Sequence, residues 1–167
     1  MVRRLGLSPT VAAQIQRYRH SAERGIGVEV EETLSVFRLV GRRPDASLVF
    51  ADAGRRAARY AAKTRGRSSR TLARLSSRLA LRAVARLARS IFGGDLKSSA
   101  NVVHIRMLAP LSFMALPTGE ACLFYGSAYL EMLRALTKFE GALLHSQCRC
   151  RGDAECRWHT AAAEVYE

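Results

Sequence analysis

The sequence lacks long hydrophobic segments. No run of apolar residues approaches the roughly 18 needed to span a bilayer, and the first residues, Met-Val-Arg-Arg-Leu-Gly-Leu-Ser-Pro, lack the continuous apolar core of a signal peptide. Hydrophobic residues still make up 49% of the 167 residues, which argues against disorder and is enough to build a core. We therefore expect a soluble, cytoplasmic protein whose cysteines are reduced unless a metal holds them.

Several motifs of common enzymes and DNA-binding proteins are also missing. The sequence has no Ser/His/Asp set, no glycine-rich phosphate loop and no pair of carboxylates suited to acid–base catalysis. It has no dinucleotide-binding fingerprint that would supply a hydride. No helix-turn-helix pattern accompanies its basic residues, so sequence-specific DNA binding is not expected. Nothing in the sequence requires an enzyme.

Acidic residues are absent from residues 53–94, which hold eleven arginines and Lys63. This segment therefore carries +12 of the formal net charge of +13. Five of its arginines recur every four residues along one expected helix: Arg70, Arg74, Arg78, Arg82 and Arg86. Such a face favours an anionic partner, an acidic protein or an anionic membrane surface before nucleic acid. Codon bias together with a solvated helix face is the alternative explanation.

Hydrophobic spacing predicts helices in the first part of the chain and mainly strands in the second. Helical spacing with start and stop signals occurs over residues 9–23, 31–39, 45–62 and 70–91. Strand patterns follow over 101–108, 111–116, 121–125, 142–150 and 156–162, with one helix over 129–139. This order predicts an α+β fold, in which N-terminal helices precede a small antiparallel sheet with a packed helix. Residues 1–44 would be a helical segment and 45–167 a metal-binding domain, together one globular unit.

Three of the four cysteines lie within nine residues, around a Gly152-Asp153 turn. They are Cys148, Cys150 and Cys156. His145 precedes them, and Cys122 stands well upstream. Zinc prefers sulfur and nitrogen donors, and a closed set of four such ligands is usually structural. Gly152 gives the backbone the freedom to reverse so that two side chains point at one ion. Disulfides are the alternative, but nothing else about the chain looks secreted.

The motif Cys148-x3-Gly152-Asp153-x2-Cys156, followed by an aromatic residue, resembles the end of the V4R (4-vinyl reductase) domain family. Cys122, placed before a helix that leads into the motif, matches the family's order of parts. The resemblance covers roughly residues 45–162. It implies a mixed fold with an antiparallel sheet and a tendency to form homodimers.

The phenol sensors of this family hold zinc with three cysteines and one carboxylate. By this resemblance the cysteines fall on Cys122, Cys148 and Cys156, and the carboxylate position falls on His145, since imidazole is also a good zinc ligand. His145 and Cys148 have opposite strand parity, so joint ligation requires a bulge or turn near Gln147. Two alternative ligands remain open. Cys150 could bind the zinc in place of Cys148 or Cys156, and His159 could bind it in place of His145.

The resemblance implies a small-molecule-binding or sensory module for an apolar or aromatic ligand, which signals through a dimer or a partner protein. An apolar pocket could be lined by Phe113, Met114, Phe124, Tyr125, Tyr129 and Met132, although ordinary core packing gives the same pattern. One alternative is a role in tetrapyrrole (bacteriochlorophyll) biosynthesis, as a substrate carrier rather than a vinyl reductase. Another is a scaffold that docks an acidic partner through the arginine-rich helix.

Overall fold

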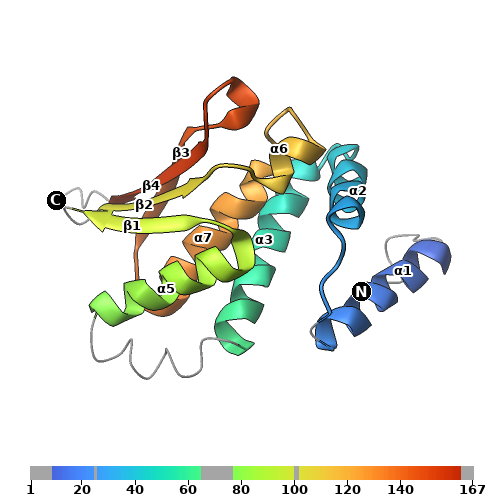
Figure 1. The fold of residues 1–167 in the computed structure, drawn as a ribbon, viewed down its shortest axis with the longest axis horizontal. Helices are drawn as coiled ribbons and strands as arrows, with labels where there is room; N and C mark the ends of the chain where they lie inside the picture. Colours follow the sequence, from blue (N-terminus) through green and yellow to red (C-terminus); the bar gives the residue numbers. More distant parts are fainter. Residues whose placement is uncertain (1–8, 25, 65–76, 100–101, 163–167) are drawn as a thin grey trace.

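The computed structural model describes residues 9–24, 26–64, 77–99 and 102–162, and it confirms the α+β fold class (Figure 1). The elements run in the following order: α1 (Pro9–Glu23), α2 (Val30–Gly41), α3 (Ala46–Thr64), α5 (Ser77–Phe92), β1 (Asp95–Ser99), β2 (Val102–Met107), α6 (Leu111–Ala115), α7 (Cys122–Thr137), β3 (Gly141–Gln147), the 3-10 turn η2 (Arg149–Arg151) and β4 (Cys156–Ala162). None of the described helices is both long enough and apolar enough to cross a membrane.

The four strands form one antiparallel sheet in the order β1-β2-β4-β3. Along β2 the side chains of Val103, Ile105 and Met107 are buried, whereas those of His104 and Arg106 are exposed. Side chains alternate between the two faces of a strand, so one face of the sheet packs on helices and the other is open. Figure 1 shows α5 and α7 beneath the sheet and α3 to the right of them, where it packs against α7.

Helix α7 is the centre of the core, because it packs against α3 on one side and against α5 and β3 on the other. Small residues on α3 allow the two helices to lie close together: Gly54, Ala58, Ala61 and Ala62 are all buried. On the other side of α7, Tyr129 packs edge-on against Trp158 of β4, with ring centroids 5.5 Å apart. These contacts fix the position of α7 relative to α3 and β4.

The strands expected over 111–116 and 121–125 are wrong. Residues Leu111–Ala115 form the short helix α6, and Cys122 is the first residue of α7. The buried residues of α7 are spaced by three or four from its beginning: Cys122, Tyr125, Ala128, Tyr129, Met132, Leu133 and Leu136. This spacing is helical throughout, so the apolar run before Gly126 belongs to the same helix as the run after it.

Two further differences from the expected elements concern residues 95–99 and the start of the helix expected over 70–91. The edge strand β1, Asp-Leu-Lys-Ser-Ser, was not expected, because its side chains are half-buried or exposed and show no apolar alternation. The helix expected over 70–91 is described from Ser77 onward as α5, so Arg70 and Arg74 lie outside the described residues. The helices expected over 9–23, 31–39 and 45–62 correspond to α1, α2 and α3.

The contact between α3 and α7 yields a stability prediction. A Cβ atom at Gly54 would overlap the backbone carbonyl oxygen of Phe124, which cannot move without displacing α7. We expect Gly54→Ala to lower the free energy of unfolding by about 2 kcal/mol or more, since overpacking against backbone is poorly relieved. The matched control is Gly27→Ala, where a Cβ meets nothing within 4 Å. Urea denaturation of both variants measures the difference, and equal stability of the two would contradict the close packing.

Candidate metal centre

Two segments far apart in the sequence meet at the candidate site. The first turn of α7 contributes Cys122, and the β3–β4 hairpin contributes the other three residues, His145 in β3, Cys148 after it and Cys156 at the start of β4. Their three sulfur atoms and one imidazole nitrogen all lie within 4.8 Å of one another. The four residues singled out in the sequence therefore lie close enough together to hold one metal ion.

A bulge in β3 makes this convergence possible. The pairing of β3 with β4 shifts register between His145 and Gln147, as required if His145 and Cys148 are to point to the same place. A bulge adds one residue to one strand and so changes which face the following side chains occupy. The bulge that was expected near Gln147 is therefore confirmed.

The spacing of the sulfur atoms fits a tetrahedral ion. The Sγ atoms of Cys122 and Cys148 lie 3.9 Å apart. Zinc–sulfur bonds of about 2.3 Å in a tetrahedron place two sulfur ligands roughly 3.8 Å apart. All four cysteines of the chain are free thiols in the structure. The structure therefore contains none of the disulfides considered as the alternative to a metal site.

The imidazole of His145 supplies a second test of fit. Its Nε2 atom is buried and has no hydrogen-bond partner among the described residues. A buried nitrogen without a partner is costly, and native proteins rarely leave one so. The ring is held by stacking on Trp158, with ring centroids 4.5 Å apart and planes 9° from parallel. A buried imidazole with an unpartnered nitrogen beside three sulfur atoms fits a metal ligand.

The backbone of the hairpin turn is arranged around the sulfur atoms. The N–H of Cys148 donates to the carboxylate of Asp153 at 2.6 Å, and the N–H of Arg149 donates to Sγ of Cys156 at 3.5 Å. Gly152 has a φ of 93°, a left-handed conformation that favours glycine. Such hydrogen bonds around the ligands orient them before a metal binds. The turn is thus built to present Cys148 and Cys156 to one ion.

The thiols differ in how readily they ionise. The hydrogen bond from Cys122 lowers the pKa of Cys156 to about 4, with help from His145 and the N–H of Arg149. The same contact, together with burial, raises the pKa of Cys122. Metal ligands must be deprotonated, so the cluster holds one sulfur that is a thiolate at neutral pH and one whose proton a metal ion would displace.

The loop from α6 to α7 closes over the cluster. The hydroxyl of Ser112, on α6 and fully buried, lies 3.3 Å from Sγ of Cys122. Gly119, with a φ of 83°, brings the loop so close that a Cβ there would lie 3.7 Å from Sγ of Cys148. The sequence showed Gly119 only as part of a Pro-Thr-Gly turn, and no sequence signal pointed to Ser112. Both residues lie against the sulfur ligands.

The two alternative ligands lie outside the group of four. The thiol of Cys150 points toward the carbonyl oxygen of Leu116, 3.7 Å away, and burial raises its pKa. His159 lies on the face of β4 opposite Trp158, next to His104 of β2 at a ring-centroid distance of 6.4 Å. His159 therefore belongs to the open face of the sheet.

A cavity of about 650 Å³ lies between α2, α3, the ends of α5 and β2, and the first turn of α7. Of the six residues expected to line a pocket, Phe124 and Tyr125 line this cavity. Tyr129 and Met132 are fully buried in the core. The ring of Phe113 lies under the guanidinium of Arg149, 4.7 Å from it, and Met114 is 53% exposed.

The remaining cavity residues come from six other elements or their connections. They include Thr33, Phe37, Ala57, Phe92, Met107, Leu108 and Leu111. No single stretch of sequence carries them, so hydrophobic spacing could not identify them as a set.

Comparison of the chain with protein-family models and with curated proteins finds no match. The V4R resemblance therefore stays an expectation based on the closing motif.

The cluster predicts a metal content that depends on named thiols. We expect about one metal ion per purified chain, lost in Cys156→Ser and retained in Cys150→Ser, because only the first variant removes a member of the cluster. Cys156→Ser should also lower the Tm by about 10 °C, since binding of a structural metal contributes to folding. Elemental analysis and thermal unfolding measure both effects. Metal loss in both variants, or in neither, would contradict the assignment.

The only tryptophan of the chain reports on the same site. Because the His145 ring stacks on Trp158, a change in the ligation of this imidazole alters the surroundings of the indole. We expect a chelator to change Trp158 fluorescence in the wild type and in Cys150→Ser, with re-addition of metal restoring it. In His145→Ala the chelator-dependent change should be strongly reduced. An unchanged response in His145→Ala would show that this residue is not a ligand.

Proposed function

We propose that the chain is a zinc-stabilised module that binds a small apolar or aromatic molecule. The observation that carries this proposal is the cavity of about 650 Å³, walled mainly by aliphatic and aromatic side chains. Ligand pockets in proteins typically have volumes of about 300–1,000 Å³ and are mostly apolar, with a few polar groups that orient the ligand. At this cavity the polar groups are those of Thr33, Asp95, Arg106 and the phenol of Tyr125.

The donor set favours zinc and a structural role for it. Three sulfur atoms and one imidazole nitrogen are ligands that zinc prefers over hard cations such as magnesium or calcium. All three cysteines are at most 4% exposed. Four protein ligands fill a tetrahedral shell and leave no position for a substrate, which supports a role in stability rather than in catalysis.

The metal and the cavity share two elements, and this link supports one combined function. In α6, Leu111 lines the cavity and the neighbouring Ser112 contacts Cys122. In α7, Tyr125 lines the cavity one helical turn after Cys122. A metal that fixes α6 and the first turn of α7 would therefore also fix one wall of the cavity. Burial raises the pKa of Tyr125 to about 12, so its phenol stays neutral and suits an uncharged ligand group.

We further propose that the module signals as a homodimer or through a partner protein, in keeping with the V4R resemblance. Helix α2 carries three well-exposed aliphatic side chains, Val30, Val36 and Leu39, which are 55%, 40% and 59% exposed. We expect multi-angle light scattering to give twice the chain mass at tens of micromolar, roughly the concentration range in which weak associations are seen. A monomeric mass at that concentration would contradict the homodimer.

A cavity-filling variant tests ligand binding. Ala57 of α3 lines the cavity, so the ring of Ala57→Phe would occupy it. We expect the wild type to bind 1-naphthol, an aromatic probe of suitable size, and Ala57→Phe to bind it at least about tenfold more weakly, a loss of about 1.4 kcal/mol. Titration calorimetry measures the affinity, and elemental analysis verifies that metal content is unchanged.

The matched control is Ala53→Phe, one turn earlier on the exposed side of α3. It adds the same ring outside the cavity and should leave 1-naphthol affinity unchanged. If Ala57→Phe binds the probe as well as the control does, the cavity is not the binding site.

A further inference from the structure

Helix α5 presents a row of arginines to solvent. Its apolar side is buried in the core through Ala80, Val84 and Leu87, among others. The opposite side carries four exposed arginines: Arg78, Arg82, Arg86 and Arg89. The described part of the arginine-rich helix is therefore amphipathic, with its apolar side already occupied.

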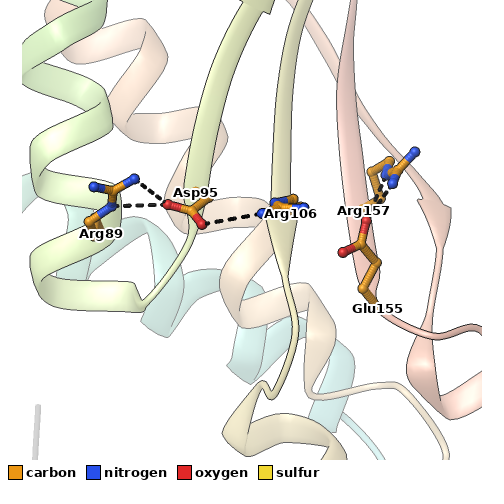
Figure 2. A network of polar contacts seen from close by, with 5 residues as sticks. All are labelled: Arg89, Asp95, Arg106, Glu155 and Arg157. Atoms are coloured by element: carbon orange, nitrogen blue, oxygen red, sulfur yellow. Dashed lines mark hydrogen bonds and ion pairs between the residues drawn. The ribbon is translucent and has the colours of Figure 1, made fainter.

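This row continues onto the open face of the sheet. Arg89 donates to the carboxylate of Asp95 in β1 at 2.9 Å, and the other oxygen of the same carboxylate lies 4.0 Å from Arg106 in β2. Figure 2 shows these three residues in line across α5, β1 and β2, with Arg157 of β4 on the next strand beside Glu155. Arg106 and Arg157 are directly paired in the sheet, so the row of cations wraps around the β1 edge.

We call these residues, together with Lys97 of β1, the cationic surface. Its members are Arg78, Arg82, Arg86, Arg89, Lys97, Arg106 and Arg157. The row along α5 is about 16 Å long at 1.5 Å per residue, and the step from β1 to β4 adds about 10 Å. The surface is therefore roughly 25 Å long, most of one turn of duplex DNA, which is about 34 Å.

The charge of this surface is not balanced within the described part of the chain. Asp95 and Glu155 are its two acids, and both already face arginines. Among the described residues no carboxylate lies within ion-pair distance of Arg78, Arg82 or Arg86. By contrast, arginines of α2 and α3 have acidic partners, as in Arg38–Glu31, Arg56–Asp52 and Arg59–Glu131. Outside the described residues the sequence holds two acids, Glu164 and Glu167.

The sheet part of the surface contains a recess of about 360 Å³. Its lining is polar and includes three cations and one acid: Asp95, Lys97, Ser98, Ser99, His104, Arg106 and Arg157. Serine hydroxyls and arginine guanidinium groups are donors that match phosphate oxygens, and the planar guanidinium can bind two of them at once. The recess could therefore accept a phosphate group that lies next to the arginine row.

We propose that the cationic surface binds the phosphate backbone of duplex DNA without sequence specificity. Interfaces with DNA are more polar and far more positively charged than interfaces between proteins, which have apolar and aromatic centres. The exposed residues of α5 and the lining of the recess include no Phe, Tyr or Trp, which argues against an acidic protein. It also argues against single-stranded nucleic acid, because bases of a single strand stack on aromatic rings.

An anionic membrane, expected from the sequence together with an acidic protein, fits less well than DNA. Amphipathic helices that bind bilayers insert their apolar side among the lipids. The apolar side of α5 is buried in the protein core and cannot do this. Attraction to a bilayer would then be electrostatic alone, whereas the groove and backbone of a duplex can follow a row of charges that wraps around an edge.

The test compares charge-matched variants. The probe is a fluorescein-labelled 20-base-pair duplex of random sequence, followed by anisotropy between 50 and 200 mM salt (roughly the range over which phosphate contacts are weakened). If about five phosphates are contacted, log K should fall with log salt at a slope of about −4.5. Arg82→Gln/Arg86→Gln should weaken binding at least about tenfold and reduce the slope by about two. Lys97→Gln should reduce the slope by about one.

The matched control is Arg38→Gln/Arg56→Gln, which removes the same net charge from α2 and α3, where both arginines have acidic partners. It should change affinity by less than about twofold, as expected for charges outside the contact. Equal losses in both double variants would mean that only total charge matters and would overturn the proposal. Tighter binding to a 20-base single strand, to phosphatidylserine-containing vesicles or to polyglutamate would overturn the choice of duplex DNA. An unchanged slope in Lys97→Gln would show that the sheet does not take part in DNA binding.

Discussion

Three sulfur atoms and one imidazole nitrogen share a space less than 5 Å across in the interior of this protein, and the arrangement of α7 and the sheet depends on how they are satisfied. Cys122 begins the helix that packs on α3, α5 and β3, while the other three residues belong to the hairpin that forms the far half of the sheet. One ion bound to all four would fasten the central helix to the sheet. Without it, a buried imidazole nitrogen stays without a partner among the described residues.

The cysteine–histidine cluster is linked to the cavity because neighbouring residues of α6 and α7 belong to both. Leu111 and Ser112 are neighbours on α6, and Cys122 and Tyr125 are one turn apart on α7. The wall made by Leu111 and Tyr125 is therefore held in place by the contacts around Cys122. The opposite wall, from α2 and α3, depends on the aromatic contact of Phe37 with Phe124, whose ring centroids are 5.6 Å apart. One wall would be fixed by a metal and the other is fixed by side-chain packing.

The sequence was most informative where structure is local. The four-residue cluster and the bulge beside it could be predicted, because three ligands belong to one hairpin and the parity of His145 and Cys148 requires an extra residue. The start of α7 was missed because the short apolar run over 121–125 was expected to form a strand. Within this helix a Cβ at Gly126 would lie 3.1 Å from the indole nitrogen of Trp158, a tight contact that favours glycine. The arginine row on α5 was visible, but its continuation depends on the pairing of Asp95 with Arg106 in a strand with no apolar alternation.

X-ray absorption at the zinc edge of the purified protein tests the central claim most directly, because it counts the atoms bound to the metal and identifies them. Ligation by Cys122, Cys148, Cys156 and His145 gives three sulfur neighbours at about 2.3 Å and one nitrogen at about 2.0 Å. Four sulfur neighbours would mean that Cys150 replaces His145. A shell of oxygen and nitrogen atoms, or no zinc at all, would contradict the metal centre that joins α7 to the β3–β4 hairpin.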